Sequence, residues 1–240
     1  MSLLDNDYDT TNSEFSFLDN YKKHYNLVNH FKQPESKVVI ILNCCGIKNS
    51  IKTLIPAYQR YRGKDFIILN DLIFKENRRV DIYVISAQYG LIPYTEIISD
   101  YNVTFNDINE KDIKNMSNEL KIREDLEKVL ENYDMCFILF GKKYGLALDI
   151  EKEFNNKCTF ISFGKEMSTI LKSNNKIEID ININTLSSIL KGYRSANVKT
   201  YVIKELLLRY TDEDLINNPS LINKFVEDLY NQKQKKTYLL

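Results

Sequence analysis

Four short runs of apolar residues, mostly β-branched or aromatic, punctuate the chain. They read KVVIILNC at 37–44, VDIYVISA at 80–87, DMCFILF at 134–140 and KCTFISF at 157–163. Nearly continuous apolar runs of this length are typical of strands that are covered on both faces in a parallel sheet. We therefore expect the four runs to be neighbours in one mainly parallel sheet.

The segments between these runs have the apolar spacing of helices. The stretch 106–133 carries an apolar stripe at helical intervals, formed by Leu120, Ile122, Leu126, Val129 and Leu130. The stretch 142–156 is long enough for a short helix. Strands that alternate with helices indicate βαβ units with right-handed crossovers. The pattern thus predicts a Rossmann-like α/β fold built on a mainly parallel sheet.

Helical patterns also flank this core at both ends of the chain. Residues 14–33 place apolar side chains at mostly helical intervals, and the sequence from 183 onward is helical in pattern. We expect an N-terminal tail and helix over 1–35, a Rossmann-like domain over 36–182 and a C-terminal helical cap over 183–240.

Composition narrows the class of protein. The chain has 33 basic and 33 acidic residues, so it lacks the overall positive field that often marks a nucleic-acid-binding protein. No apolar run approaches the roughly 20 residues that span a bilayer, and the N-terminus does not resemble a secretory signal. The four cysteines lie on or at the end of apolar runs, which predicts mostly buried thiols, and they lack the paired CxxC spacing of a zinc site. We expect a cytoplasmic protein with no membrane contact, metal or cofactor.

Each expected strand ends in glycine and polar residues. The tips read NCCGIKNS at 43–50, SAQYGLIPY at 86–94, FGKKYG at 140–145 and SFGKE at 162–166. In an open parallel sheet, ligands bind beyond the carboxyl ends of the strands. Strand-to-helix turns also use glycine and polar residues, and none of the tips matches a dinucleotide or P-loop fingerprint. A shared ligand site and ordinary turns therefore both remain open.

If the tips form a site, the SAQYGL run breaks because its polar residues turn toward a ligand, and Gly90 lets the backbone approach it. A second candidate segment is YRGKDF at 61–66, whose aromatic and basic residues suit a base and a phosphate. The expected ligand-binding residues are Cys44, Cys45, Lys48, Tyr61, Arg62, Ser86, Gln88, Gly90, Tyr101, Gly141, Lys142, Tyr144, Gly164 and Glu166.

Several strings resemble, in order and spacing, one uncharacterised domain family of bacteria, archaea and viruses. They are ILNCCGIKNS, IPAYQRYRGKDF, YVISAQYGLIPYTEIISDYNVTF and CFILFGKKYGLAL, within about residues 37–165. That family is known mainly as a companion or fused part of tRNA-guanine-transglycosylase-like enzymes, which place deazaguanine bases in nucleic acid. More distantly, the chain looks like the YaaA peroxide-stress family, whose members are associated with DNA binding. The resemblance implies a role in nucleic-acid base modification.

The sequence departs from the resembling family at one informative place. Where that family has Pro-Tyr-Asp, this chain has Asp100, Tyr101 and Asn102. A reaction at an N-glycosidic bond needs a carboxylate, and Asp100 is our first candidate, with Tyr89 as a phenol donor or stacking ring. Asp65, Glu96 and Glu166 are further candidates, and a capping or loop role for Asp100 is the ordinary alternative.

The basic residues of the expected cap suggest a second kind of partner. Tyr193, Arg194, Lys199 and Lys204 lie along one helical stretch and would suit a DNA or RNA backbone, although the solvated face of a cap helix is the ordinary explanation. Three functions follow as hypotheses. The protein binds a nucleotide or nucleobase and acts at an N-glycosidic bond; or it is a non-catalytic nucleic-acid-binding or partner subunit of a base-modification enzyme; or it is a nucleotide sensor in a defence or stress system.

Overall fold

A computed structural model describes residues 36–179, 186 and 197–237, with side chains omitted at 165–166 and 232–237. The helix expected over 14–33 lies outside these residues. The main sheet has six strands in the order β4-β3-β1-β6-β7-β8. They span Val38–Asn43 (β1), Asp81–Ser86 (β3), Gly90–Pro93 (β4), Met135–Leu139 (β6), Thr159–Phe163 (β7) and Lys176–Ile179 (β8).

The four apolar runs are neighbours in this sheet, as predicted, and all three contacts between them are parallel. In register, Ile40 of β1 faces Ile82 of β3 on one side and Phe137 of β6 on the other. Strand β7 pairs with β6 beyond them. Residues Val38–Leu42 of β1 are at most 1% exposed, so the run is apolar on both faces because both faces are covered.

Two short strands extend the sheet beyond the predicted runs. Strand β8 adds a parallel edge next to β7, while β4 folds back antiparallel on β3 and ends at Pro93. A separate two-stranded sheet pairs β2 (Ile55–Pro56) with β5 (Ile97–Ile98). The sequence placed 90–93 in a strand tip and did not predict β8.

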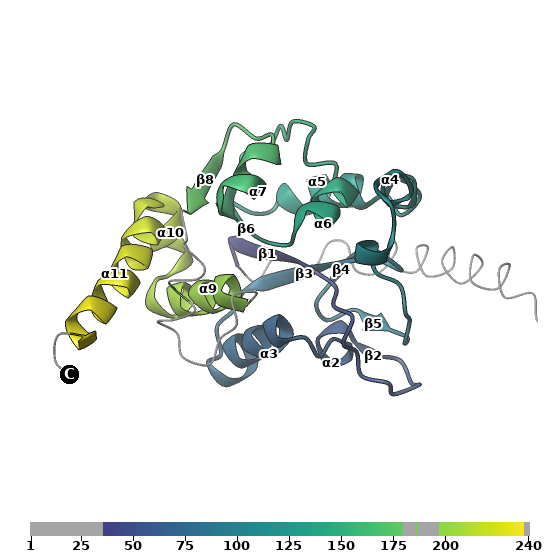
Figure 1. The fold of residues 1–240 in the computed structure, drawn as a ribbon, viewed down its shortest axis with the longest axis horizontal. Helices are drawn as coiled ribbons and strands as arrows, with labels where there is room; N and C mark the ends of the chain where they lie inside the picture. Colours follow the sequence, from purple (N-terminus) through teal and green to yellow (C-terminus); the bar gives the residue numbers. More distant parts are fainter. Residues whose placement is uncertain (1–35, 180–185, 187–196, 238–240) are drawn as a thin grey trace, which may run out of the picture. The chain divides into compact units, whose positions relative to one another are not determined.

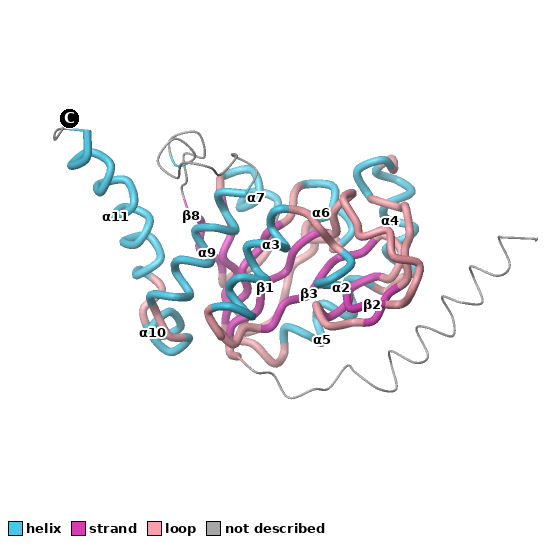
Figure 2. The backbone as a smooth tube through the Cα atoms, turned by 90° about the horizontal axis from the view of Figure 1, so that it is seen from below, coloured by secondary structure: helices cyan, strands magenta, loops and turns pink. Residues whose placement is uncertain are grey.

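Helices cover the two faces of the main sheet (Figures 1 and 2). One face carries α2 (Ala57–Arg60), α3 (Lys64–Asn70) with its π-helical continuation η1 (Asp71–Lys75), and α9 (Val198–Arg209). The other carries α4 (Glu110–Glu119), α5 (Ile122–Leu130), α6 (Lys142–Ala147) and α7 (Lys165–Ile170), with the 3-10 turn η2 (Phe105–Asp107) ahead of α4. Within the described residues, no helix is long and apolar enough to cross a membrane.

The single amphipathic stripe predicted over 106–133 belongs to two helices. Lys121 adopts a left-handed conformation with φ 52° and separates α4 from α5. Ile122, Leu126, Val129 and Leu130 are buried from α5, whereas Leu120 is buried at the end of α4. The helical spacing is confirmed, but the single helix is wrong. Nothing in the sequence signals the break at Lys121, because lysine is neither glycine nor proline.

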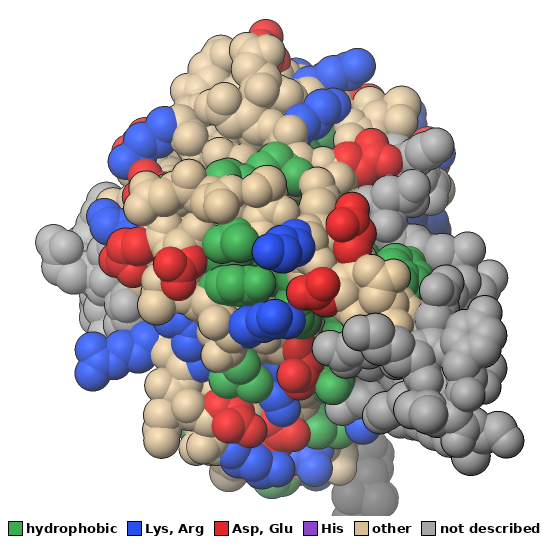
Figure 3. Space-filling model, turned by 90° about the vertical axis from the view of Figure 1, so that its left-hand side faces the viewer, with side chains coloured by type: hydrophobic (Ala, Val, Ile, Leu, Met, Phe, Trp, Pro, Cys, Tyr) green, Lys and Arg blue, Asp and Glu red, His purple; other side chains and the backbone are tan. Residues whose placement is uncertain are grey.

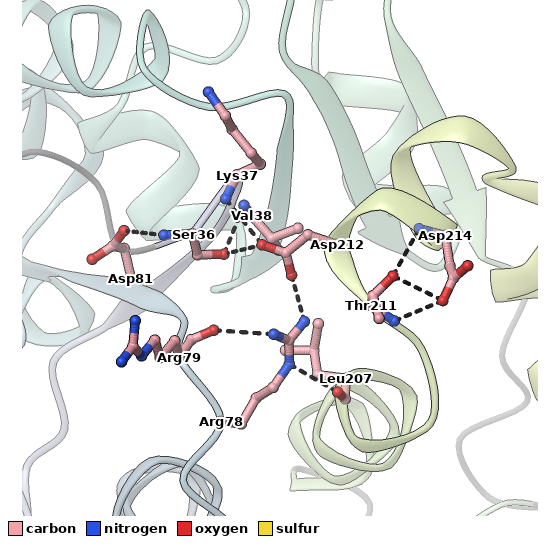
Figure 4. A network of polar contacts seen from close by, with 10 residues as sticks. All are labelled: Ser36, Lys37, Val38, Arg78, Arg79, Asp81, Leu207, Thr211, Asp212 and Asp214. Atoms are coloured by element: carbon pink, nitrogen blue, oxygen red, sulfur yellow. Dashed lines mark hydrogen bonds and ion pairs between the residues drawn. The ribbon is translucent and has the colours of Figure 1, made fainter.

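The C-terminal helices are α9, α10 (Asp212–Asn217) and α11 (Ser220–Thr237), and the end of α9 and the start of α10 attach at the amino end of β1 (Figure 4). The Asp212 carboxylate accepts hydrogen bonds from the Ser36 hydroxyl (2.5 Å) and the Lys37 amide (3.0 Å), and forms a close ion pair with Arg78. Arg78 Nε donates to the carbonyl of Leu207 at the end of α9 (2.9 Å). This network joins the start of the first strand to two helices from the far end of the chain.

Candidate functional site

The strand order reverses between β1 and β6. The chain passes from β1 to β3 on one side, and then from β6 through β7 to β8 on the other. The helices that follow β1 and β6 lie on opposite faces of the sheet (Figure 1). Such a switch point leaves room for a ligand beyond the carboxyl ends of the two strands.

Cys44 and Tyr144 meet at this switch point. Cys44 follows β1 directly, and Tyr144 lies in α6 just after β6. The thiol and the phenol oxygen are 3.2 Å apart, and the same phenol oxygen is 2.9 Å from Oγ1 of Thr104. Both Cys44 and Tyr144 are buried. Burial, and then the neighbouring Cys44, raise the pKa of the Tyr144 phenol far above its usual value, so the phenol is neutral.

A second set of hydroxyls lies on the β3 side of Cys44. The phenol oxygens of Tyr61 and Tyr101 are 2.5 Å apart, and the Ser86 hydroxyl donates to the phenol oxygen of Tyr101 (2.9 Å). Burial, followed by the charge that Cys44 would carry, raises the pKa of the Tyr61 phenol. We call Cys44, Tyr61, Ser86, Tyr101 and Tyr144 the phenol cluster. Its members come from five separate segments of the chain, and all five were predicted from the sequence to share a site.

The phenol cluster predicts a loss of stability at alkaline pH. Burial raises the pKa values of Tyr61, Tyr101 and Tyr144 in the folded protein, whereas the unfolded chain ionises near the usual tyrosine value of about 10. Above that pH the unfolded state binds fewer protons than the folded state, so the contribution of these phenols, complete below about pH 10, declines as the pH rises. The urea midpoint of unfolding should be lower at pH 10.5 than at pH 8. Tyrosinate absorbance at 295 nm should show that the buried phenols ionise only when the protein unfolds. Full ionisation of all tyrosines in the still-folded protein would contradict this.

The SAQYGL segment forms a tight hairpin between β3 and β4. The Ser86 hydroxyl oxygen accepts the amides of Gln88 (3.2 Å) and Tyr89 (3.1 Å), and Gly90 has φ 78°, which favours glycine. A Cβ on Gly90 would lie 3.1 Å from the carbonyl oxygen of Leu120. The backbone that approaches Gly90 is therefore that of α4, and the apolar run breaks in order to reverse direction. A ligand contact of Gln88 or Gly90 stays a prediction.

The two residues predicted to be catalytic lie close together but differ in exposure. Tyr89 is buried, and its hydroxyl is hydrogen-bonded to Oγ of Ser99. Asp100 is half-exposed, and its Oδ1 accepts the amide of Tyr101 (3.1 Å). The rings of Tyr89 and Tyr101 meet edge to face with centroids 5.3 Å apart. Asp100 thus borders the phenol cluster on its solvent side, where a carboxylate is available.

Arg60, which the sequence analysis did not single out, holds the loops around Asp100. Its guanidinium is fully buried, and donates to the carbonyl oxygens of Asn49, Ile51, Thr53 and Ile98 at 2.5 to 3.4 Å. Its Nη1 is 3.9 Å from Oδ1 of Asp100. An arginine in a short helical segment is usually read as a surface residue, so the sequence carried no signal for this role.

The segment after β1 wraps over the cluster. Nζ of Lys48 lies 4.3 Å from the ring centroid of Tyr101, and Lys48 forms a backbone bridge with Tyr61. The partly exposed Cys45 thiol donates to the Ile47 carbonyl (3.0 Å) and accepts the Gly63 amide, and burial raises its pKa. The side chain of Arg62 is exposed at the rim. Lys48 is therefore the cation that touches the cluster, and Cys45 is not prepared as a thiolate nucleophile.

The remaining predicted residues are more peripheral. Gly141 and Lys142 are exposed at the end of β6, where Lys142 lies 3.8 Å from Glu110. Gly164, with φ 84°, follows β7, which is two strands away from β1. The side chain of Glu166 lies outside the described residues. The structure brings the tips of β1, β3 and β6 together and places the tip of β7 farther along the sheet edge.

Two other candidate carboxylates from the sequence have different surroundings. Asp65 accepts hydrogen bonds from Asn197 (3.0 Å) and Thr200, at the start of α9, so it links α3 to that helix. Glu96 is buried, and its backbone carbonyl accepts the amide of Ala57. Within the described residues, no three His, Cys, Asp or Glu side chains gather as metal ligands would.

Two of the basic side chains on α9, those of Lys199 and Lys204, contact the body of the protein. Nζ of Lys199 donates to the carbonyl of Phe163 (3.3 Å), and Nζ of Lys204 lies 3.9 Å from Asp71. Tyr193 and Arg194 lie outside the described residues. On the side of the molecule with the C-terminal helices, Lys and Arg side chains are interspersed with Asp and Glu (Figure 3). This mixture of charges gives no continuous basic track in that view.

A comparison with curated proteins gives no match to the sequence. Among solved structures, the chain is similar to AF0587, whose crystal structure is described as that of a protein of unknown function. The identity is 12% and the TM-score 0.35, over 72% of this chain and 55% of AF0587. This chain thus spans about half the length of AF0587.

A family comparison matches residues 39–169 to the "Family of unknown function (DUF6884)". The matched segment runs from β1 into α7 and contains every residue of the phenol cluster. Because the match covers more than half of the 240 residues, the protein belongs to this family.

Proposed function

We propose that the phenol cluster, with Lys48 and Asp100 at its rim, binds a nucleoside or nucleotide. The protein then acts at an N-glycosidic bond of a nucleoside or of a base in nucleic acid. One observation carries this proposal. Five hydroxyl or thiol side chains from separate segments converge beyond the carboxyl ends of β1, β3 and β6, with the ammonium of Lys48 and the carboxylate of Asp100 beside them. Polar groups that converge among aromatic side chains are typical of a site for a planar polar ligand.

The neutral phenols of the cluster suit hydrogen bonding to a ligand, whereas Asp100 at its rim offers a carboxylate for a reaction. The raised pKa values of Tyr61, Tyr101 and Tyr144 keep these phenols neutral, so they donate and accept hydrogen bonds instead of attacking as nucleophiles. Tyr101 is the partly exposed member of the three, so the place of its ring is where a planar base would stack. Asp100 is the half-exposed carboxylate next to Tyr101, and such a group stabilises positive charge that develops on a sugar ring when a glycosidic bond breaks.

The resemblance of the SAQYGL and neighbouring strings to companions of tRNA-guanine-transglycosylase-like enzymes supports a base in nucleic acid as the substrate. A second candidate, a partner subunit without catalysis, is favoured by exposed apolar residues near the rim. Ile47 is 68% exposed and Leu54 60% exposed, and Ile51 and Ile97 are also exposed. Exposed aliphatic side chains close to one another are typical of surfaces that meet another macromolecule.

Retained small molecules test the binding proposal most directly. We expect mass spectrometry of freshly purified protein, or calorimetric titration with nucleosides and nucleotides, to detect a bound ligand of this class. Failure of every nucleoside and nucleotide to bind would overturn it. The alternative of a non-catalytic nucleic-acid-binding subunit has its own test: anisotropy titrations with DNA and RNA should show binding that weakens steeply with added salt.

Asp100→Asn separates catalysis from binding. The substitution keeps the side chain's size and its acceptor for the Tyr101 amide but removes the charge. We expect the melting temperature to stay unchanged and turnover of a bound nucleoside to fall at least about tenfold, because a positioned carboxylate contributes about a hundredfold or more to such reactions. Asp107→Asn, an exposed substitution in η2, is the matched control. Equal turnover by both variants would assign Asp100 to the loop structure alone.

A further inference from the structure

The ring of Tyr101 fills the centre of the candidate site. It lies in the segment 99–104, which forms neither helix nor strand, and the residue is partly exposed. Tyr61 and Tyr89 both meet the ring edge to face, at centroid distances of 6.4 and 5.3 Å and interplanar angles of 90° and 87°. Nζ of Lys48 lies 4.3 Å from its centroid. The ring thus occupies an aromatic slot with a cation over its face.

The hydrogen bonds at the end of this slot have a defined direction. A serine hydroxyl has one proton and two lone pairs. The Ser86 oxygen already accepts the amides of Gln88 and Tyr89, so its proton is directed to the phenol oxygen of Tyr101. Tyr61 provides a second hydroxyl at 2.5 Å, which can donate or accept. The far end of the slot therefore requires an oxygen that accepts a hydrogen bond.

We infer that the Tyr101 side chain occupies the base subsite of this protein, and that the ligand is a single six-membered ring whose carbonyl oxygen replaces the phenol oxygen when Tyr101 rotates outward. This inference rests on the proposed function and specifies its ligand. The phenol matches a uracil-type pyrimidine ring in size and planarity. A carbonyl accepts the proton from Ser86, whereas an exocyclic amine would present hydrogens to it.

The cation over the ring narrows the ligand class further. An ammonium above an aromatic face favours a neutral or electron-rich ring and disfavours a positively charged one. Tyr101 consequently competes with the ligand, so the wild-type protein binds more weakly than a variant with an empty slot. Asp100 precedes Tyr101 and its Oδ1 accepts the Tyr101 amide, so a half-exposed carboxylate lies beside the slot.

Replacing Tyr101 by alanine empties the slot, so that small molecules can be tested for binding in place of the missing side chain. We expect p-cresol, the free equivalent of a tyrosine side chain, and uracil each to raise the melting temperature of Tyr101→Ala by about 3–6 °C at ten times their dissociation constants. p-Toluidine, which has an amine in place of the hydroxyl, should bind at least about tenfold more weakly. Tyr101→Phe keeps the slot filled, so neither probe should stabilise it. Tyr101→Ser replaces Tyr101→Ala should the latter fail to fold.

Each other outcome overturns a stated part of the inference. If p-cresol binds but uracil does not, the ligand class is wrong. If neither binds, or if both stabilise Tyr101→Phe or the distant control Tyr210→Ala equally, no base slot exists at Tyr101. A nucleoside or nucleotide bound by the wild-type protein in that case leaves the proposed function intact at another subsite. Binding of uracil to Tyr101→Ala without binding of any nucleoside to either protein sustains the slot and overturns the function.

Discussion

Replacing Arg60 by methionine is expected to lower the free energy of unfolding by about 3–5 kcal/mol, the largest loss we predict for any substitution near the site. The methionine fills part of the same volume but leaves the carbonyl oxygens of Asn49, Ile51 and Thr53 without their donor. Because Arg60 is fully buried, water can reach these carbonyl oxygens only if the loop that carries them opens. Urea denaturation at pH 7 measures the change.

Arg62→Met is the matched control, since Arg62 is exposed two residues away. Its effect should stay within about 0.5 kcal/mol. Arg60→Lys should recover only part of the stability, because one ammonium cannot reach four carbonyl oxygens as a planar guanidinium does. If Arg60→Met and Arg62→Met have similar unfolding midpoints, Arg60 does not hold the loops in the way described.

Replacing Asp212 by alanine is expected to cost about 2–4 kcal/mol, allowing for the partial exposure of its partner. The Asp212 carboxylate receives the Ser36 hydroxyl, the Lys37 amide and the Arg78 guanidinium, whose side chain is 21% exposed. Without the Asp212 carboxylate, the Arg78 guanidinium loses its ion-pair partner and the Lys37 amide at the start of β1 loses its acceptor (Figure 4). Hydrogen exchange should accelerate in α10 and in the first residues of β1 together.

The control for this substitution is Asp228→Ala in α11. Asp228 lies 3.6 Å from Arg209 in an ion pair whose side chains are 38% and 49% exposed, so its loss should cost at most about 1 kcal/mol. If Asp212→Ala accelerates exchange in α10 but leaves β1 protected, the network does not join the two ends of the chain.

The central sheet was predictable because its strands are covered on both faces. Continuous apolar runs mark β1, β3, β6 and β7 without ambiguity. Strand β8 escaped prediction because it has only four residues, two of them charged, and Ile179 alone is buried. Strand β4 escaped because it is four residues long and begins at a glycine that marks a turn.

The convergence of the strand tips was also predictable, because parallel strands bring their carboxyl ends to one edge. Which tips touch was not, because that depends on strand order: β6 lies beside β1, which pairs Tyr144 with Cys44, while β7 lies one strand farther away. The sequence also did not predict which way each side chain points. Tyr101 turns inward to Ser86 while its neighbour Asp100 remains half-exposed, and no sequence spacing distinguishes the two in a segment without regular structure.

The hairpin edge of the main sheet bears on how copies of this protein meet one another. Strand β4 contributes four residues, packs against α5 and ends at Pro93, which has no amide hydrogen to offer a further strand. An open strand edge is a template for intermolecular pairing and aggregation, and proteins block it with short strands, proline or a covering helix. Strand β4 is short and ends in a proline, so concentrated solutions of the folded protein should not add strands along this edge.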